Sequence, residues 1–233
     1  NGFVVNLSGN LTNSGQWIQK RTELSVNLYQ VLSITAGKSF DSYFVVKDST
    51  GLVKAGSNLI VTRTFDLNKT VFDMGNYSLT LKGDGSYVTN GTVINTKDLI
   101  GVHINGLYPV VENIIYNGNI NLKGLLRFNW TVTLRGNVTV IDTIQNSTGY
   151  AHPEKVLKII GSFANNGLVR DGGSNGFVLD ITGNIIRNKN PLNKRVQLSG
   201  DGKRTVDLTG YTGTILSNGT NVQLSGVNYL PYL

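Results

Sequence analysis

The pentapeptide VQLSG occurs at residues 196–200 and again, unchanged, at residues 222–226. Each copy alternates apolar and polar side chains before it ends on a glycine, which tolerates the positive φ of a turn. This alternation is typical of a β-strand with one buried face. Looser copies of the phrase end on glycine throughout the chain, at residues 6–9, 80–83, 121–124, 133–136, 180–183 and 207–210. The sequence therefore predicts an all-β fold.

The spacing of these copies bears on the kind of β fold. A solenoid stacks similar coils at a near-constant period. The closing glycines do not keep such a period, because they lie at residues 9, 83, 124, 136, 183, 200, 210 and 226. We therefore expect antiparallel β-sandwiches, and a parallel β-helix or solenoid is the alternative.

Asn-Gly dipeptides favour the antiparallel interpretation. Asn-Gly supplies the two positive-φ residues of a type I′ hairpin turn. It occurs seven times, at residues 1, 90, 105, 117, 166, 175 and 218. Matched strand halves flank the pairs that begin at residues 90, 117 and 218. We expect short antiparallel hairpins there, with Val88 and Val93 in strands.

The composition is poor in charge and rich in amides. Charged residues make up 15% of the 233 residues, against roughly 25% in an ordinary domain, while Asn and Gly each number 28. No apolar run approaches the ~18 residues that cross a bilayer, so no membrane span is expected. The chain has no cysteine and begins with Asn. We expect a mature secreted chain or a fragment of one, located outside the cell or on its surface.

The net charge of +7 is concentrated near the repeated phrase. A basic patch can bind nucleic acid or an acidic polysaccharide. We interpret these residues as solvated turns and as charges that guard sheet edges, and we expect no nucleic-acid partner. The members of the cluster are Arg187, Lys189, Lys194, Arg195, Lys203 and Arg204.

The N-terminal segment forms an apolar strand of its own. Phe3, Val5 and Leu7 alternate with other residues, and Leu11 follows on the same pattern. We expect residues 1–12 to be an N-terminal strand that pairs in its own sheet or is donated to a neighbouring subunit. Residues 13–233 form the all-β body, with a division into two subdomains expected near residues 149–155, where Pro153 also favours one helical turn.

Catalytic patterns are scarce. The segment GGSNG at residues 172–176 matches a nucleophile elbow, but that chemistry needs a later histidine, and both His103 and His152 precede it. Two distant histidines without cysteine leave no zinc spacing. Trp17 and Trp130 fit either a core position or a sugar-stacking surface. We expect no catalytic residue, no metal, no cofactor and no enzymatic activity.

Asn-x-Ser/Thr sequons are more frequent than the composition explains. Random placement of the Asn, Ser and Thr residues predicts about 4.6 such triplets, and the chain contains nine. Asn and Thr also favour turns and exposed strand positions, which is the alternative explanation. The sequons predict covalent glycans at Asn6, Asn10, Asn68, Asn76, Asn90, Asn129, Asn137, Asn146 and Asn218.

An all-β chain with an apolar first strand, no cysteine, little charge and many sequons resembles the subunits of archaeal surface structures. These include S-layer proteins and the thin glycosylated thread filaments of the Sulfolobales. The resemblance to the thread family implies that an N-terminal strand, here Phe3, Val5, Leu7 and Leu11, completes the β fold of the next subunit. A bacterial adhesin passenger is a second resemblance, because its β-helix favours phrases such as LSGNLTN at residues 7–13.

These observations predict a non-enzymatic extracellular structural subunit of a cell-surface filament or layer. It would assemble head to tail with copies of itself by β-strand addition and carry covalent glycans. The alternative is a carbohydrate-binding adhesin or tailspike-type β-helix protein, with surface polysaccharide as its partner.

Overall fold

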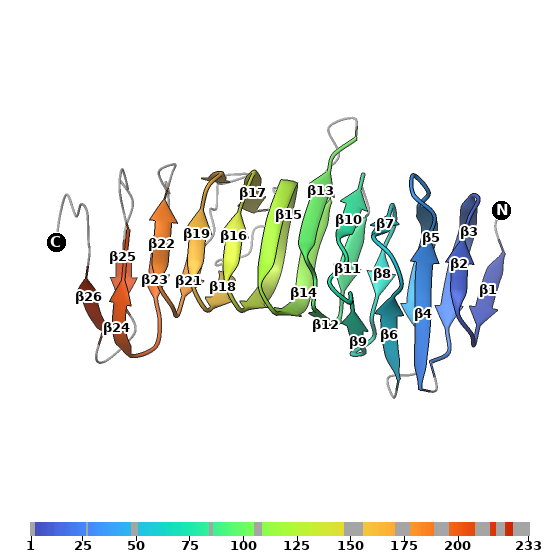
Figure 1. The fold of residues 1–233 in the computed structure, drawn as a ribbon, viewed down its shortest axis with the longest axis horizontal. Coiled ribbons are helices and arrows are strands. Elements are labelled where there is room, and N and C mark those ends of the chain that lie inside the picture. The colour runs from blue at the N-terminus through green and yellow to red at the C-terminus, as the bar shows by residue number, and fades with distance from the viewer. Residues whose placement is uncertain are drawn as a thin grey trace.

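The computed structural model is an elongated β-solenoid with β1 (Val4–Leu7) and β26 (Val222–Ser225) at opposite ends of its long axis (Figure 1). It describes residues 3–26, 28–47, 51–83, 86–104, 109–146, 156–170, 178–188, 196–207, 215–217 and 222–225. Every strand pairing in these ranges is parallel, and these ranges contain strands but no helix. No helix in the described part of the chain is long and apolar enough to cross a membrane. The all-β prediction is confirmed.

The pairings resolve into three columns of stacked strands, which we call columns A, B and C. Each coil of the chain contributes to A, then B, then C. Column A contains β1 (Val4–Leu7), the end of β3 (Trp17–Leu24), the end of β5 (Phe40–Val46), β8 (Phe65–Asp66), β11 (Tyr87–Thr89), the start of β14 (Val110–Asn117), the middle of β15 (Ile120–Arg135), β17 (Thr143–Asn146) and β20 (Leu168–Arg170).

Columns B and C are built in the same way, and the long strands β14 and β15 turn the corners between columns. Column B contains β2 (Leu11–Asn13), β4 (Tyr29–Ile34), β6 (Leu52–Ala55), β9 (Val71–Asp73), β12 (Gly91–Ile94), the ends of β14 and β15, β18 (Val156–Ile160), β21 (Val178–Ile181), β23 (Val196–Leu198) and β25 (Ile215–Ser217). Column C contains the starts of β3, β5 and β15 with β7 (Leu59–Val61), β10 (Leu79–Lys82), β13 (Asp98–Val102), β16 (Val138–Val140), β19 (Phe163–Asn165) and β22 (Ile185–Asn188). A separate pair joins β24 (Gly202–Thr205) to β26 (Val222–Ser225).

The expected antiparallel sandwich is wrong, and the alternative solenoid is the observed fold. Val88 and Val93 lie in strands as predicted, but β11 belongs to column A and β12 to column B, so the two do not form a hairpin. Asn90 has a φ of 59° and turns the corner between them. Gly118, with a φ of 114°, likewise turns the corner between β14 and β15. A positive φ is needed at a solenoid corner as well as at a hairpin, so Asn-Gly does not distinguish the two.

The repeated phrase does not stack on itself. The first copy forms β23, which pairs with β21 and β25, whereas the second copy forms β26, which pairs with β24. The looser copies at residues 6–9, 80–83 and 133–136 end strands in columns A, C and B, and the copy at residues 121–124 lies inside β15, so the spacing of their glycines is not the coil period. The predicted helical turn and the boundary near residues 149–155 lie mostly outside the described residues. On either side of that segment β15 and β18 pair in parallel, from Val132 with Leu157 onward.

The interior of the solenoid is filled by inward-facing apolar side chains from all three columns. Phe40, Phe44, Phe65 and Phe72 form an edge-to-face ladder with ring centroids 5.0, 5.7 and 5.0 Å apart. Each of these four side chains is at most 1% exposed. Such pairs stabilise a core beyond the burial of their area. Aliphatic residues continue the core toward the C-terminal coils, including Leu134, Ile159, Ile181 and Leu198.

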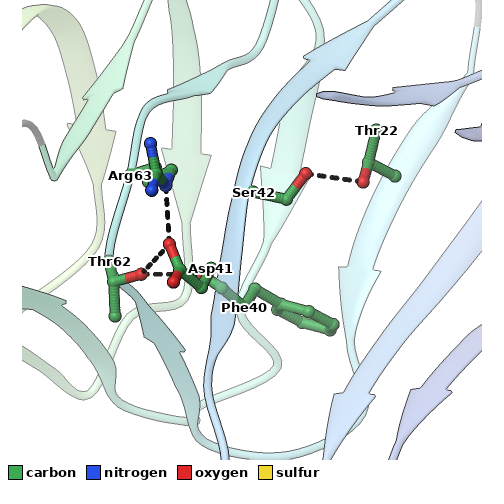
Figure 2. Close-up of polar contacts among 6 residues, drawn as sticks. All are labelled: Thr22, Phe40, Asp41, Ser42, Thr62 and Arg63. Carbon is green, nitrogen blue, oxygen red and sulfur yellow. Dashed lines mark hydrogen bonds and ion pairs between the residues drawn. The ribbon is translucent and has the colours of Figure 1, made fainter. Parts of the chain in front are cut away.

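Alternate residues of β5 face opposite sides of the wall, as Figure 2 shows. The Ser42 hydroxyl lies inside, 2.8 Å from the Thr22 hydroxyl, and both residues are fully buried. The Asp41 carboxylate lies outside and accepts hydrogen bonds from Thr62 Oγ1 at 3.1 Å and Arg63 Nε at 2.6 Å. The inner polar pair is satisfied within the core, which keeps its burial from being costly.

Candidate functional site

The N-terminal strand pairs within its own solenoid. β1 runs parallel to β3, with Val4 opposite Arg21 and Leu7 opposite Leu24. Phe3 is 80% exposed, Val5 and Leu7 are half-buried, and Leu11 is buried in β2. The structure therefore brings Leu7 and Leu11 to the core but leaves Phe3 at the surface. Among the described strands, β3 is the one neighbour of β1, so the other edge of β1 is open.

The sequons fall into different environments. Asn6, Asn10, Asn68, Asn76, Asn90 and Asn137 are exposed. Asn129 is 5% exposed, and its Nδ2 donates to Glu112 Oε2 at 3.0 Å. A glycan at Asn129 would have to break this contact and leave the wall of the solenoid. Nothing is described for the side chain of Asn146, and Asn218 lies outside the described residues.

Several asparagines join one coil to the next through the side-chain oxygen. Asn10 Oδ1 accepts from Val31 N at 2.9 Å, Asn58 Oδ1 from Ser78 N at 2.8 Å, and Asn119 Oδ1 from Asn137 N at 3.0 Å. Asn184 Oδ1 accepts from Thr205 N at 2.8 Å. Each of these backbone donors immediately precedes the first residue that pairs with the coil before it, so the asparagine oxygen satisfies a donor where that ladder begins. They explain part of the asparagine excess without glycosylation.

The residues considered for catalysis and stacking do not gather into a site. The Trp17 side chain packs against the core, and its Nε1 donates to Thr22 Oγ1 at 3.1 Å. His103 is exposed, whereas His152 and residues 172–176 lie outside the described residues. Nothing is described for the side chain of Trp130. Within the described ranges, no three His, Cys, Asp or Glu side chains are close enough to hold a metal ion.

The corner between columns B and C carries a groove that the sequence did not predict. Its volume is about 370 Å³, and it spans three consecutive coils. The backbone there repeats one conformation, with φ values of 67° at Asn76, 56° at Asn95 and 114° at Gly118. Asn76 N donates to Asn95 O at 2.7 Å, and Asn95 N donates to Asn117 O at 3.2 Å, so the turns stack in register. The groove is lined by Gly75, Asn76, Asn95, Thr96, Gly118 and Asn119.

One carboxylate fixes the edge of this groove. Asp73 Oδ1 accepts from Gly75 N at 2.9 Å and from Asn95 Nδ2 at 2.9 Å. It therefore orders the turn of its own coil and the amide of the next coil. Asp66 makes the same two contacts at the corner between columns A and B, with Asn68 N at 3.0 Å and Asn90 Nδ2 at 3.2 Å.

Thr96 contributes to the lining of the groove, but its hydroxyl is buried. The residue is 4% exposed, and Oγ1 has less than 1 Å² of accessible surface, so a ligand in the groove does not reach this atom. The remaining lining groups are amides and glycine backbone, and none is charged. The Tyr77 ring lies beside Gly75 and is 38% exposed.

The groove could have been found from the sequence only once the coil register was known. Asn76, Asn95 and Asn119 are 19 and 24 residues apart, and they lie side by side because the solenoid stacks them. No protein-family model, no curated protein and no solved structure matches this chain. The proposed function therefore rests on the geometry of the corner groove.

Proposed function

We propose that this protein is a non-enzymatic extracellular β-solenoid that binds a neutral carbohydrate through the corner groove. The observation that carries the proposal is the alignment of three asparagines from consecutive coils, Asn76, Asn95 and Asn119, along one groove. Amides and hydroxyls both donate and accept hydrogen bonds, as the hydroxyl groups of a sugar do. An uncharged lining favours a neutral ligand over an acidic one.

The size and surroundings of the groove support the same ligand class. Sites for small molecules have volumes of roughly 300 to 1,000 Å³, and this groove, at about 370 Å³, suits one or a few sugar rings. Tyr77 offers an aromatic face next to Gly75, where a sugar ring can stack. Asp73 holds the Asn95 amide in place before the ligand arrives, which reduces the entropy lost on binding.

An extracellular location is supported by the low charge content and by the sequons. The surface relies on amides and hydroxyls, and six sequon asparagines are exposed. A rigid solenoid presents its corners at fixed spacing, which suits an adhesin that meets a polymeric ligand at a surface.

The test is a binding titration with neutral hexose and N-acetylhexosamine oligosaccharides, followed by calorimetry or NMR shifts. Asn76→Asp replaces an exposed lining amide with a carboxylate of the same shape, and we expect about a tenfold loss of affinity, since one hydrogen bond contributes roughly 0.5 to 1.5 kcal/mol. Asn68→Asp is the matched control, because Asn68 is also exposed and has a positive φ of 43°, but it does not line the groove. Absence of binding by the wild type, or an equal loss in both variants, would contradict the proposal.

Assembly into a head-to-tail homopolymer is a second candidate, favoured by apolar exposure on the first two coils. Phe3 and Ile18 on the first coil are 80% and 59% exposed, and Leu28 on the second coil is 82% exposed. Phe3 O and Leu7 O accept from β3, so the alternate residues Val4 and Asn6 direct their backbone groups to the open edge. We propose that another copy of this chain adds a strand there.

Val4→Pro tests the assembly without removing a bond to β3. Proline deletes the Val4 N–H, which faces the open edge, and proline is tolerated in edge strands. Wild-type protein should form oligomers in analytical ultracentrifugation, and the variant should remain monomeric and folded. A wild type that stays monomeric up to its solubility limit, or a variant that assembles equally well, would rule this assembly out.

A further inference from the structure

Asn76 is a sequon asparagine, and it is also one of the residues that line the corner groove. The sequon is Asn76-Tyr77-Ser78. Asn76 is exposed, and its Nδ2 donates to no described residue. Asn68, Asn90 and Asn129 differ, because their Nδ2 atoms donate to Lys47 O, Asp66 Oδ1 and Glu112 Oε2.

The backbone around Asn76 is fixed in the orientation that lines the groove. Asn76 N donates to Asn95 O at 2.7 Å, and the preceding Gly75 N donates to Asp73 Oδ1 at 2.9 Å. Tyr77 N donates to Met74 O at 2.8 Å and closes the turn. A sugar attached at Nδ2 therefore begins at the groove itself, within reach of Asn95 and Asn119.

We infer that Asn76 carries an N-linked glycan whose first sugar occupies the corner groove and closes it to free carbohydrate. This inference rests on the proposed carbohydrate binding, because it assigns that site a covalently attached occupant and so a means of regulation. The glycan comes from a lipid-diphosphate-linked oligosaccharide. The bond between the anomeric carbon and the diphosphate oxygen breaks, the bond from that carbon to Nδ2 forms, and Nδ2 loses one proton.

Substitution of Ser78 by alanine removes the sequon without changing any residue that lines the groove. Ser78→Ala removes the sequon hydroxyl, and Ser78→Thr retains it. Ser78 Oγ also donates to Asp98 Oδ2 at 3.1 Å, so Ser78→Ala loses one partly buried hydrogen bond while Asp98 keeps Asn121 and Lys123. The wild type, Ser78→Ala and Ser78→Thr are each produced in a host that glycosylates sequons and in a host that does not. The non-glycosylating host shows what the substitutions alone do to binding.

The expected result is a glycan at Asn76 in the wild type and in Ser78→Thr, but not in Ser78→Ala, as measured by peptide mass mapping. In the glycosylated preparations, only Ser78→Ala should bind the neutral oligosaccharide, with at least a tenfold advantage. In the non-glycosylating host, all three should bind alike. On folded wild type, the glycan at Asn76 should also be released by a peptide-N-glycosidase more slowly than one at Asn10.

Two results would overturn the inference. One is an unmodified Asn76 in the glycosylating host. The other is a modified Asn76 whose glycan is released as fast as the one at Asn10 and leaves binding of free oligosaccharide unchanged. Failure of the proposed function can be distinguished from these results. In that case the unglycosylated protein would bind no oligosaccharide, while mass mapping and the rate of glycan release would still show whether Asn76 carries a glycan held in the groove.

Discussion

The Asn95 side-chain amide donates to Asp73 Oδ1 across 2.9 Å, so a residue in one coil is held by a carboxylate in the coil before it. The same carboxylate oxygen accepts from Gly75 N at 2.9 Å. Asp73 thus links the backbone of the turn to the side chain that lines the groove. Stability and the proposed carbohydrate binding depend there on the same atom.

Asp73→Ala should lower the free energy of unfolding by about 1 to 2 kcal/mol, because two donors lose their partner. It should also weaken carbohydrate binding, since the Asn95 amide is no longer held. Asp66→Ala is the matched control, because Asp66 makes the equivalent contacts away from the groove. Urea unfolding should give similar losses for both, and calorimetry should show weaker binding for Asp73→Ala alone. Equal binding by the two variants would show that Asp73 does not support carbohydrate binding.

Gly161→Ala should destabilise the protein by about 3 kcal/mol or more. Gly161 has a φ of 149°, and a Cβ there would lie 2.2 Å from Gly136 O. Gly15→Ala should change stability by less than about 0.5 kcal/mol, because a Cβ at Gly15 meets nothing within 4 Å. Thermal and urea unfolding of the two variants check this difference. A Gly161→Ala protein as stable as Gly15→Ala would show that the corner turns are not closely stacked.

Phe65→Ala should cost about 3 to 5 kcal/mol, as expected when a large core side chain is removed. Phe65 contacts Phe44 and Phe72 edge to face, with centroids 5.7 and 5.0 Å away, and is 1% exposed. Phe3→Ala serves as the exposed counterpart, with an expected change within about 0.5 kcal/mol in the monomer. Urea unfolding monitored by circular dichroism measures both. A small loss at Phe65 would mean that the ladder is not packed as described.

Because of Asp98, the free energy of unfolding should decrease as the pH falls into the acid range. Burial acts to raise the pKa of its carboxyl, but hydrogen bonds from Lys123, Asn121 and Ser78 and the charge of Lys123 outweigh it and hold the pKa below its usual range. A group whose pKa is lowered in the folded state stabilises the fold above its unfolded pKa of about 3.9, and this contribution disappears as the pH falls through the folded pKa.

The Asp98→Asn variant should therefore lose stability at neutral pH and show a shallower decline on acidification than the wild type. Asp41→Asn is the comparison, because Asp41 pairs with Arg63 at the exposed surface, where ion pairs contribute little. Urea unfolding at steps from about pH 6 to pH 2 measures both slopes. Identical pH profiles for wild type and Asp98→Asn would remove Asp98 as a source of acid sensitivity.

The sequence predicts which residues form strands better than it predicts how the strands pair. Val5 and Leu7 lie in β1, and Val196–Leu198 form β23, as expected from their alternation. Alternation and positive-φ corners are common to antiparallel and parallel sheets, so Asn90 and Gly118 could not decide between them. The groove depends on which coils are neighbours. The sequence identifies Asn76 as the first residue of a sequon. The position of Asn76 beside Asn95 and Asn119, however, follows from the pairing register alone.

The corner between columns B and C also indicates where the chain tolerates changes in length. Ile114 pairs with Val132, 18 residues later, whereas Val132 pairs with Leu157, 25 residues later. The described strands of both coils keep to the same three columns despite this difference in length, and the stacking of Gly118, Gly136 and Gly161 continues through both coils. Insertions between columns should therefore be accommodated as bulges, while a single-residue insertion within a strand would reverse which side chains face the core. This solenoid can thus acquire new surface loops without rebuilding its interior.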